Sequence, residues 1–263
     1  LSMGIQTFNE SILKVLQRRH TARQAIEAFQ NCRAAGFQNI SIDLMYGLPG
    51  ETLSTWQQDL DQALLLHPEH LSAYHLIYEE DTVLWKLREQ HKVEEADEDL
   101  SVSLFSTLID RLTSEGYDHY EISNFSLPGL YSRHNSSYWT EKKYLGCGPS
   151  AHSYNGVSRQ WNVASLDTYI KGISAGTPVF EIEELDLYTR YNDFVITRIR
   201  TEWGMPLSKL RDEFGEKLYD YCLRMAAPHL KQGTLELVND ILKLTRKGIF
   251  ISDGIMSDML WTD

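Results

Sequence analysis

A repeated alternation of buried strands and amphipathic helices constrains the fold of this chain more than any other feature. Residues 40–46 (ISIDLMY) predict a strand that is buried on most sides, and residues 71–78 predict a second one. The segment between them predicts a helix, with Ser54 and Gln57 at capping-box spacing. Strands joined by helices of this length form a parallel sheet with right-handed crossovers. The sequence therefore predicts an α/β fold, either an open doubly wound sheet or a (β/α) barrel.

The same pattern extends in both directions along the chain. Residues 1–8 predict a strand, and the sequence opens inside its apolar segment. Residues 9–18 predict a helix, and a second helix follows, with Thr21 and Gln24 at capping-box spacing at its start. Further on, residues 100–112 predict a helix and residues 117–125 predict one alternating strand. Because a parallel strand at a chain end exposes backbone groups that a neighbour should cover, we expect further strands to precede this segment.

The second half of the chain differs from the first in its amino-acid composition and in the length of its predicted helices. Residues 131–153 are rich in aromatic residues, glycine, asparagine and histidine, and they predict a binding segment or an ordered loop. Short helices at 188–200 and 206–214, followed by a hairpin-like stretch at 234–245, have the outline of a winged helix. We therefore expect the first lobe to end near Leu127-Pro128-Gly129 and a further, mainly helical part to begin at about Glu181.

Charge and composition narrow the possible partners. The formal net charge is −12, and no basic cluster is visible that could bind a phosphate backbone, so we do not expect nucleic acid as a partner. No apolar run approaches the ~18 residues that a membrane-spanning helix needs. The three cysteines are scattered, which is typical of a reducing compartment and predicts a cytoplasmic protein.

Polar residues near the carboxyl ends of parallel strands are candidates for ligand binding, because ligands meet the loops beyond those ends. Gln6 and Asp43 occupy such places, and Asp43 lies between Ile42 and Leu44 in a strand that should be buried. A buried carboxylate is costly unless it is paired or binds something. The alternative interpretation of Asp43 is a core aspartate whose oxygens accept structural hydrogen bonds. Arg18 is a weaker candidate for ligand binding, and its alternative interpretation is a solvated arginine at a helix end.

The most distinctive local motif is HNSSYW at residues 134–139. Imidazole can ligate iron, and flat aromatic side chains can cover a porphyrin, so this composition suits heme. A histidine that makes an ordinary structural hydrogen bond is the alternative interpretation of His134. Cys147, in the glycine-rich stretch that follows, has no CxxC companion, so we do not expect a metal cluster there.

Several of these segments together resemble, in order and spacing, the oxygen-independent coproporphyrinogen III oxidase-like family of radical SAM proteins. They are LSMGIQTFNE, ISIDLMYGLPGET, HLSAYHLIYEEDT, GYDHYEISNFSLPG, and SRHNSSYW followed by YLGCGPSAHSY. The HNxxYW block is most similar to the HemW-type heme chaperones within that family. The resemblance implies about the second half of a radical SAM (β/α) barrel at residues 1–125, a connecting segment with HNSSYW at 126–178, and a smaller, mainly helical HemN-type C-terminal domain at 179–263.

The resemblance also implies cofactors and residues that hold them. Gln6, Arg18, Asp43 and Ile77 fall where the family contacts S-adenosylmethionine, and His134 matches the histidine associated with heme. The family binds a [4Fe-4S] cluster through a CxxxCxxC loop, and this sequence contains no CxxxCxxC. We therefore interpret the chain as a truncated form that is not expected to catalyse a reaction on its own.

Three functions follow from the resemblance. The first is a HemW-like protein that binds heme and delivers it to respiratory acceptor proteins. The second is an oxygen-independent coproporphyrinogen III oxidase, an enzyme that decarboxylates coproporphyrinogen III to protoporphyrinogen IX. The third is a folded fragment with no activity of its own.

Overall fold

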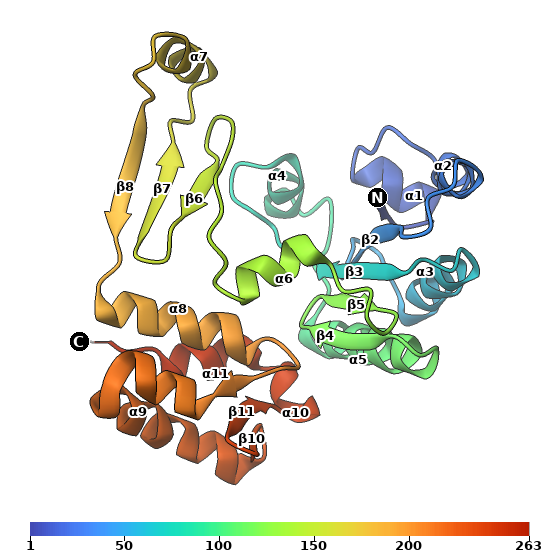
Figure 1. Ribbon diagram of the computed structural model, residues 1–263. Helices are drawn as coiled ribbons and strands as arrows, with labels where there is room; N and C mark the ends of the chain where they lie inside the picture. The colour runs from blue at the N-terminus through green and yellow to red at the C-terminus, as the bar shows by residue number, and fades with distance from the viewer. Residues whose placement is uncertain (263) are drawn as a thin grey trace. The chain divides into compact units, whose positions relative to one another are not determined.

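The computed structural model describes residues 1–262 and divides the chain into two compact units, Leu1–Ser132 (unit 1) and Arg133–Asp263 (unit 2) (Figure 1). Unit 1 alternates strands and helices, and unit 2 combines a small antiparallel sheet with a mainly helical part. The predicted α/β fold is thus present in unit 1. The three regions expected from the sequence, with boundaries after residues 125 and 178, stay a prediction.

The centre of unit 1 is a five-stranded sheet with the order β1-β2-β3-β5-β4. β1 (Ser2–Gln6), β2 (Ser41–Tyr46) and β3 (His70–His75) are parallel, as predicted. β5 (Asn124–Ser126) and β4 (Asp118–Glu121) are antiparallel to their neighbours. The prediction of a single strand over residues 117–125 is therefore wrong, because the chain reverses after Glu121 and forms a hairpin.

Five helices connect these strands. They are α1 (Glu10–Val15), α2 (Ala22–Ala34), α3 (Leu53–Leu65), α4 (Val83–Glu89) and α5 (Glu98–Ser114). The capping box of Thr21 and Gln24 is confirmed at the start of α2. The one predicted from Ser54 and Gln57 is wrong, because α3 is capped two residues earlier by Thr52, whose hydroxyl accepts from the Thr55 amide.

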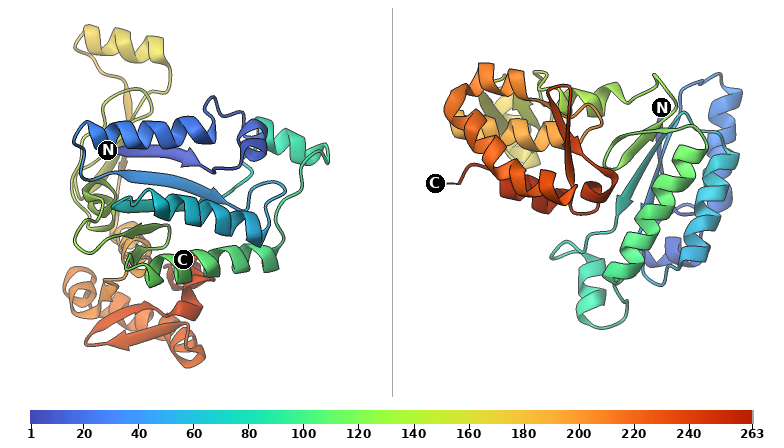
Figure 2. Two further views of the ribbon diagram at one scale, coloured as in Figure 1. Left: turned by 90° about the vertical axis from the view of Figure 1, so that its right-hand side faces the viewer. Right: turned by 90° about the horizontal axis from the view of Figure 1, so that it is seen from below.

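The hydrophobic core of unit 1 lies on one face of the sheet. Ile42, Leu44, Leu71 and Phe125 point to that face and are fully buried. Helices α2, α3 and α5 lie on the same side of the sheet (Figure 2). Trp56 on α3 is also fully buried, and its indole Nε1 donates a 3.0 Å hydrogen bond to the Leu104 carbonyl of α5. The helices thus cover one face, and the opposite face carries the polar residues described below.

Unit 2 begins with α6 (Arg133–Trp139) and a three-stranded antiparallel sheet of order β6-β7-β8. The strands are β6 (His152–Tyr154), β7 (Ser158–Asn162) and β8 (Phe180–Glu184), with α7 (Leu166–Ser174) between the last two. The HNSSYW motif is therefore helical, so that side chains four residues apart share one face.

The rest of unit 2 has the predicted winged-helix outline. Its elements are α8 (Leu187–Ile199), β9 (Met205–Pro206), α9 (Leu207–Gln232), β10 (Leu235–Val238), β11 (Ile241–Leu244), α10 (Arg246–Ile249) and α11 (Ser252–Met259). The predicted hairpin is present as β10 and β11. The helix predicted for residues 206–214 continues to Gln232 after a break at Gly215, where φ is 79°. Within the described residues, no helix is long and apolar enough to cross a membrane.

Candidate functional site

A row of polar residues crosses the sheet of unit 1 on the face opposite the helices. Gly4 pairs with Asp43, Asp43 with Ser72, Ser72 with Asn124, and Asn124 with Glu121. The residues on either side of this row point to the buried apolar face, because side chains alternate along a strand. The fold therefore gathers polar side chains from four strands at one level of the sheet, next to Gly4 on the fifth.

Asp43, which the sequence singles out as a buried carboxylate, is part of a hydrogen-bonded chain. Its Oδ2 accepts from the Ser2 hydroxyl at 3.3 Å, and its side chain also accepts from Ser72. The Ser72 hydroxyl also lies 3.0 Å from Asn124 Oδ1, so its single proton is shared between the Asp43 carboxylate and the Asn124 amide oxygen. Burial raises the pKa of Asp43 above its ordinary value, and the two serine hydroxyls oppose that rise. The carboxylate is therefore oriented by its neighbours while its residue stays partly exposed.

Gln6 and Arg18 meet above the backbone of Gly4. The Arg18 Nη2 donates to the Gly4 carbonyl at 3.3 Å. A Cβ placed on Gly4 would lie 2.6 Å from Gln6 Nε2 and 3.5 Å from Arg18 Nη2. Because Gly4 has no side chain, the Gln6 amide and the Arg18 guanidinium can approach its backbone. Both groups lie next to Asp43, which pairs with Gly4 in the sheet. These groups can bind a carboxylate, an amine and hydroxyls, which fits the amino acid and ribose parts of S-adenosylmethionine.

The fourth residue predicted for this site, Ile77, lies beyond the end of β3, the strand next to the one that carries Asp43. It follows Ser72 by five residues, and 71% of it is exposed. The structure therefore brings Gln6, Arg18 and Asp43 together around Gly4, and the place of Ile77 at this site stays a prediction.

The predicted heme residue, His134, lies exposed on α6 and begins a series of ring contacts. Its ring meets that of Tyr138 edge-on at a centroid distance of 5.2 Å, with the Tyr138 hydroxyl 3.4 Å from Nε2. Tyr138 contacts Tyr144 at 5.1 Å, and Tyr144 contacts Tyr154 at 6.0 Å. We call these four residues the aromatic ladder. An accessible imidazole next to aromatic rings fits heme, because it offers an iron ligand beside apolar surface.

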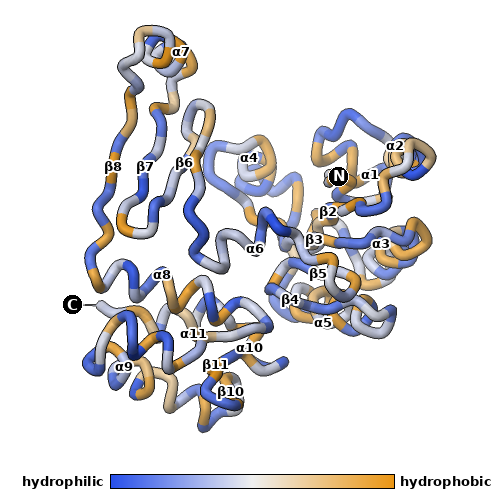
Figure 3. The backbone as a smooth tube through the Cα atoms, in the orientation of Figure 1, coloured by the Kyte–Doolittle hydropathy of each residue, from blue (hydrophilic) through white to orange (hydrophobic). Residues whose placement is uncertain are grey.

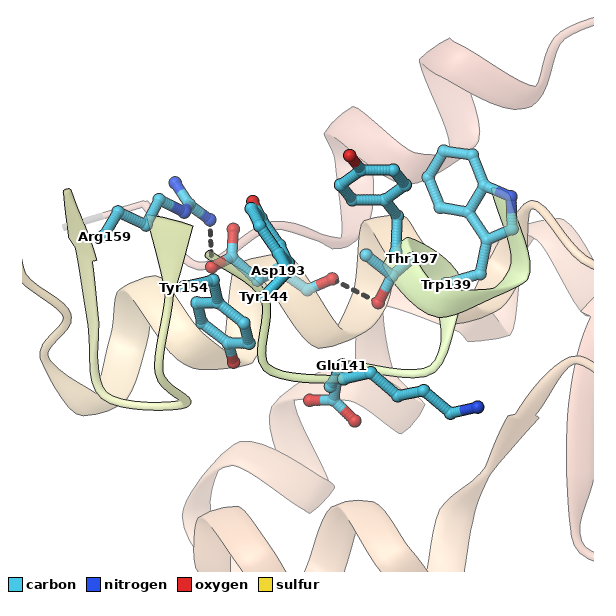
Figure 4. Close-up of a pocket in the computed structure, with 9 residues that line it drawn as sticks. Trp139, Glu141, Tyr144, Tyr154, Arg159, Asp193 and Thr197 are labelled. Atoms are coloured by element: carbon cyan, nitrogen blue, oxygen red, sulfur yellow. Dashed lines mark hydrogen bonds and ion pairs between the residues drawn. The ribbon is translucent and has the colours of Figure 1, made fainter. Parts of the chain in front are cut away.

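A small cavity borders the ladder (Figure 4). Its volume is about 160 Å³, and Tyr138, Tyr144 and Tyr154 are among the residues that line it. Arg159 of β7 and Asp193 of α8 also line it, and they form an ion pair. Pockets that enclose drug-sized ligands measure about 300–1,000 Å³, so this cavity is too small to enclose a porphyrin. A macrocycle bound here would lie on the exposed side of the ladder.

Glu141 fixes the segment that carries the ladder. It accepts hydrogen bonds from Arg198 of α8 at 2.8 Å and from Lys209 of α9 at 3.0 Å. Burial opposes ionisation, but the two cations together hold the pKa of Glu141 below its ordinary value. Glu141, Arg159 and Asp193 are missed by the sequence analysis, because their partners lie 34 to 68 residues away in the chain and no local pattern connects them.

The cysteines do not form a metal site in the described part of the chain. Cys32, Cys147 and Cys222 are all free, and no group of three histidine, cysteine or acidic side chains could hold a metal ion among residues 1–262. Burial raises the pKa of the Cys222 thiol to about 11, which keeps it protonated. The candidate sites described here therefore consist of polar and aromatic side chains.

Comparison with known proteins places these features in a family. Residues 1–63 match the model of the radical SAM superfamily, and residues 185–251 match that of the HemN C-terminal domain. The chain is 31% identical over 266 residues to the heme chaperone HemW of Lactococcus lactis subsp. lactis, which covers 100% of this chain and 69% of that protein. It is 29% identical over 261 residues to the heme chaperone HemW of Bacillus subtilis, and this match covers 99% of this chain and 69% of that protein.

A solved structure shows the same fold. Coproporphyrinogen III oxidase (HemN) from Escherichia coli, a radical SAM enzyme, superimposes with a TM-score of 0.80 at 21% identity, covering 98% of this chain and 63% of that structure. This likeness confirms the predicted combination of part of a radical SAM barrel with a HemN-type C-terminal domain. The chain belongs to the HemN/HemW-like family of radical SAM proteins.

Proposed function

We propose that this chain is the heme-binding part of a HemW-like chaperone, which holds heme and passes it to acceptor proteins such as respiratory enzymes. The observation that carries the proposal is the exposed His134 at the head of the aromatic ladder. The relatives at about 30% identity are named heme chaperones, which favours this function over the alternative of coproporphyrinogen III oxidase. HemN, at 21% identity, supports the fold alone.

The geometry of α6 suits a carrier that must release its ligand. His134 would supply an imidazole nitrogen to the heme iron, and Tyr138 would offer its ring to one edge of the macrocycle. Because both side chains lie at the surface, heme held there would stay accessible to an acceptor. An enclosed pocket would bind heme more tightly and would slow its transfer.

Replacing His134 by alanine is expected to weaken heme binding at least tenfold and to shift or abolish the Soret band of the complex, because the iron loses its protein ligand. Heme titration of the chain, followed by absorbance, measures both effects. His152→Ala is the matched control, since His152 is also exposed and belongs to the same unit. Unchanged spectra and affinity for His134→Ala would assign the iron to another ligand.

We also infer that Gln6, Arg18, Asp43 and Ile77 contact S-adenosylmethionine. The convergence of the first three residues around Gly4 supports this assignment, and Ile77 would offer exposed apolar surface beyond the end of β3. A [4Fe-4S] cluster, when bound in this family, supplies the electron that cleaves S-adenosylmethionine. This sequence has no CxxxCxxC, the motif through which the family binds the cluster. The three free cysteines agree with a cytoplasmic location.

Asp43→Asn is expected to weaken S-adenosylmethionine binding roughly tenfold, because the amide loses the charge that attracts an amine or hydroxyl donor. The fold should persist, since the remaining carbonyl oxygen can still accept from Ser2 or Ser72. Calorimetric titration into the full-length protein measures the change. Asp61→Asn, at an exposed position on α3, should leave affinity unaltered. Equal affinities for wild type and Asp43→Asn would remove Asp43 from the site.

A further inference from the structure

The strand β8 is an open edge of the β6-β7-β8 sheet. All five of its residues, Phe180–Glu184, are exposed (Figure 1). On its inner side β8 pairs with β7. At the two ends of this pairing, Val163 N donates to Val179 O and Leu185 N donates to Val157 O. These two bonds show which residues of β8 direct their backbone groups toward β7. Because backbone groups alternate in direction along an antiparallel strand, the amides and carbonyls of Phe180, Ile182 and Glu184 face the open edge.

Apolar side chains continue from this edge onto α7. Figure 3 shows alternating hydrophilic and hydrophobic segments along β8 and hydrophobic segments in α7. The helix exposes Leu166, Ile170 and Ile173, which are four and three residues apart and therefore share one face. Gly172 lets the following chain pack closely on the helix, because a Cβ there would lie 2.9 Å from the Thr177 carbonyl. We call the exposed apolar residues of this region the α7–β8 face; they are Leu166, Ile170, Ile173, Val179, Phe180 and Ile182.

The charge of β8 defines what can pair with it. Glu181 and Glu183 point to one face of the strand, and Phe180 and Ile182 point to the other. Glu183 lies 3.9 Å from Arg159, whereas Glu181 has no cation within 4.0 Å among residues 1–262. A strand that alternates basic and apolar residues would place its cations opposite these carboxylates and its apolar side chains opposite Phe180 and Ile182. Such cross-strand pairs of opposite charge stabilise a sheet.

A second copy of this chain fits the edge poorly. If two β8 strands paired in antiparallel fashion about Ile182, Glu181 of each copy would lie directly opposite Glu183 of the other. Like charges directly opposite each other destabilise a sheet. Proteins avoid such pairing by placing charges on edge strands, and here the charges are all acidic, so they disfavour pairing of two β8 strands in this register while they leave the edge open to a basic strand.

We propose that β8 and α7 form a docking site for a partner protein, which adds an extended strand of alternating basic and apolar residues to the edge of β8. Main-chain hydrogen bonds to Phe180, Ile182 and Glu184 supply affinity, and the acidic face of β8 selects the sign of the partner's charge. The apolar face of α7 extends the contact beyond the strand.

The test uses a fluorescein-labelled peptide, Lys-Val-Lys-Val-Lys-Val, and its acidic counterpart, Glu-Val-Glu-Val-Glu-Val, titrated with the full-length protein and followed by anisotropy. The basic peptide should bind and the acidic one should not. Ile182→Pro removes an outward amide without breaking the hydrogen bonds to β7, and it should weaken binding roughly tenfold. Ile182→Val keeps that amide and should bind like wild type.

Charge reversal supplies an independent readout. Glu181→Lys should weaken binding of the basic peptide about fivefold and bring its affinity closer to that of the acidic one. Hydrogen exchange should show fast exchange at Phe180, Ile182 and Glu184 in the free protein and slower exchange with the basic peptide. The proposal is overturned if these amides are already protected in the full-length protein, if both peptides bind alike, or if Ile182→Pro dissolves a dimer.

Discussion

Replacing Trp56 by alanine is expected to destabilise unit 1 by about 3–5 kcal/mol, the range for truncating a large buried aromatic side chain. Trp56 is fully buried between the sheet and α5, where its ring lies 5.6 Å from that of Tyr46. Its indole also donates to the Leu104 carbonyl, so the change loses a hydrogen bond as well as packing. Because α3 and α5 both cover the sheet that carries Asp43, the loss should loosen the polar row too.

Two further variants separate the contributions of packing and hydrogen bonding at this position. Trp56→Phe keeps most of the packing but leaves the Leu104 carbonyl without its donor, so it should cost less than Trp56→Ala, about 1–3 kcal/mol. Leu65→Ala, at an exposed position of the same helix, should change stability by less than about 0.5 kcal/mol. Urea-dependent hydrogen exchange of β2 amides measures each loss. Similar losses for Trp56→Ala and Leu65→Ala would contradict the proposed role of Trp56.

Much of unit 1 could be predicted from the sequence, because periodicity and caps are local signals. The strand β2 and the start of α2 at Thr21 were predicted in this way. The hairpin of β4 and β5 was not, because the alternation of apolar residues continues through its turn, which contains no glycine. The Glu121 carboxylate stabilises that turn by accepting from the Ser123 amide at 3.2 Å. A contact of this kind has no signature in hydrophobic periodicity.

The candidate sites show the same division between local and distant information. Asp43 could be singled out because a charge inside an apolar strand is a local anomaly, and His134 because it lies in a motif with aromatic residues. The extension of the aromatic ladder from Tyr138 to Tyr154 depends on how separate elements pack. The ion pair of Arg159 and Asp193, on β7 and α8, depends on the same packing, which no spacing rule describes.

Glu51→Gln is expected to stabilise unit 1 at pH 8 by about 2 kcal/mol more than at pH 5. Glu51 lies buried in the turn after β2, where its Oε2 accepts from the amides of Gly47 at 2.7 Å and Leu48 at 3.3 Å. Its Oε1 has no hydrogen-bond partner among residues 1–262. Burial, with a smaller contribution from the charge of Asp59, raises the pKa of Glu51 to about 7.

The sign of the effect follows from the two protonation equilibria. In the unfolded chain the Glu51 carboxyl has its ordinary pKa of 4.5, whereas in the folded protein it keeps its proton up to about pH 7. The folded state therefore binds more protons in this window, and wild-type stability falls as the pH rises from about 4.5 to 7. At about 1.36 kcal/mol for each pH unit, the shift from 4.5 to about 7 corresponds to a full loss of about 3.4 kcal/mol, and a part of that loss has already occurred by pH 5.

Glutamine can keep the acceptor for Gly47 and Leu48 without a charge, so the variant should lack the wild-type loss of stability. Urea denaturation of both proteins at pH 5, 6, 7 and 8, followed by circular dichroism, gives the difference at each pH. Glu80→Gln, at an exposed position, controls for the loss of one negative charge from an acidic protein. If the difference between Glu51→Gln and wild type were the same at every pH, Glu51 would be ionised in the folded protein throughout, and its unpartnered oxygen would have to be solvated.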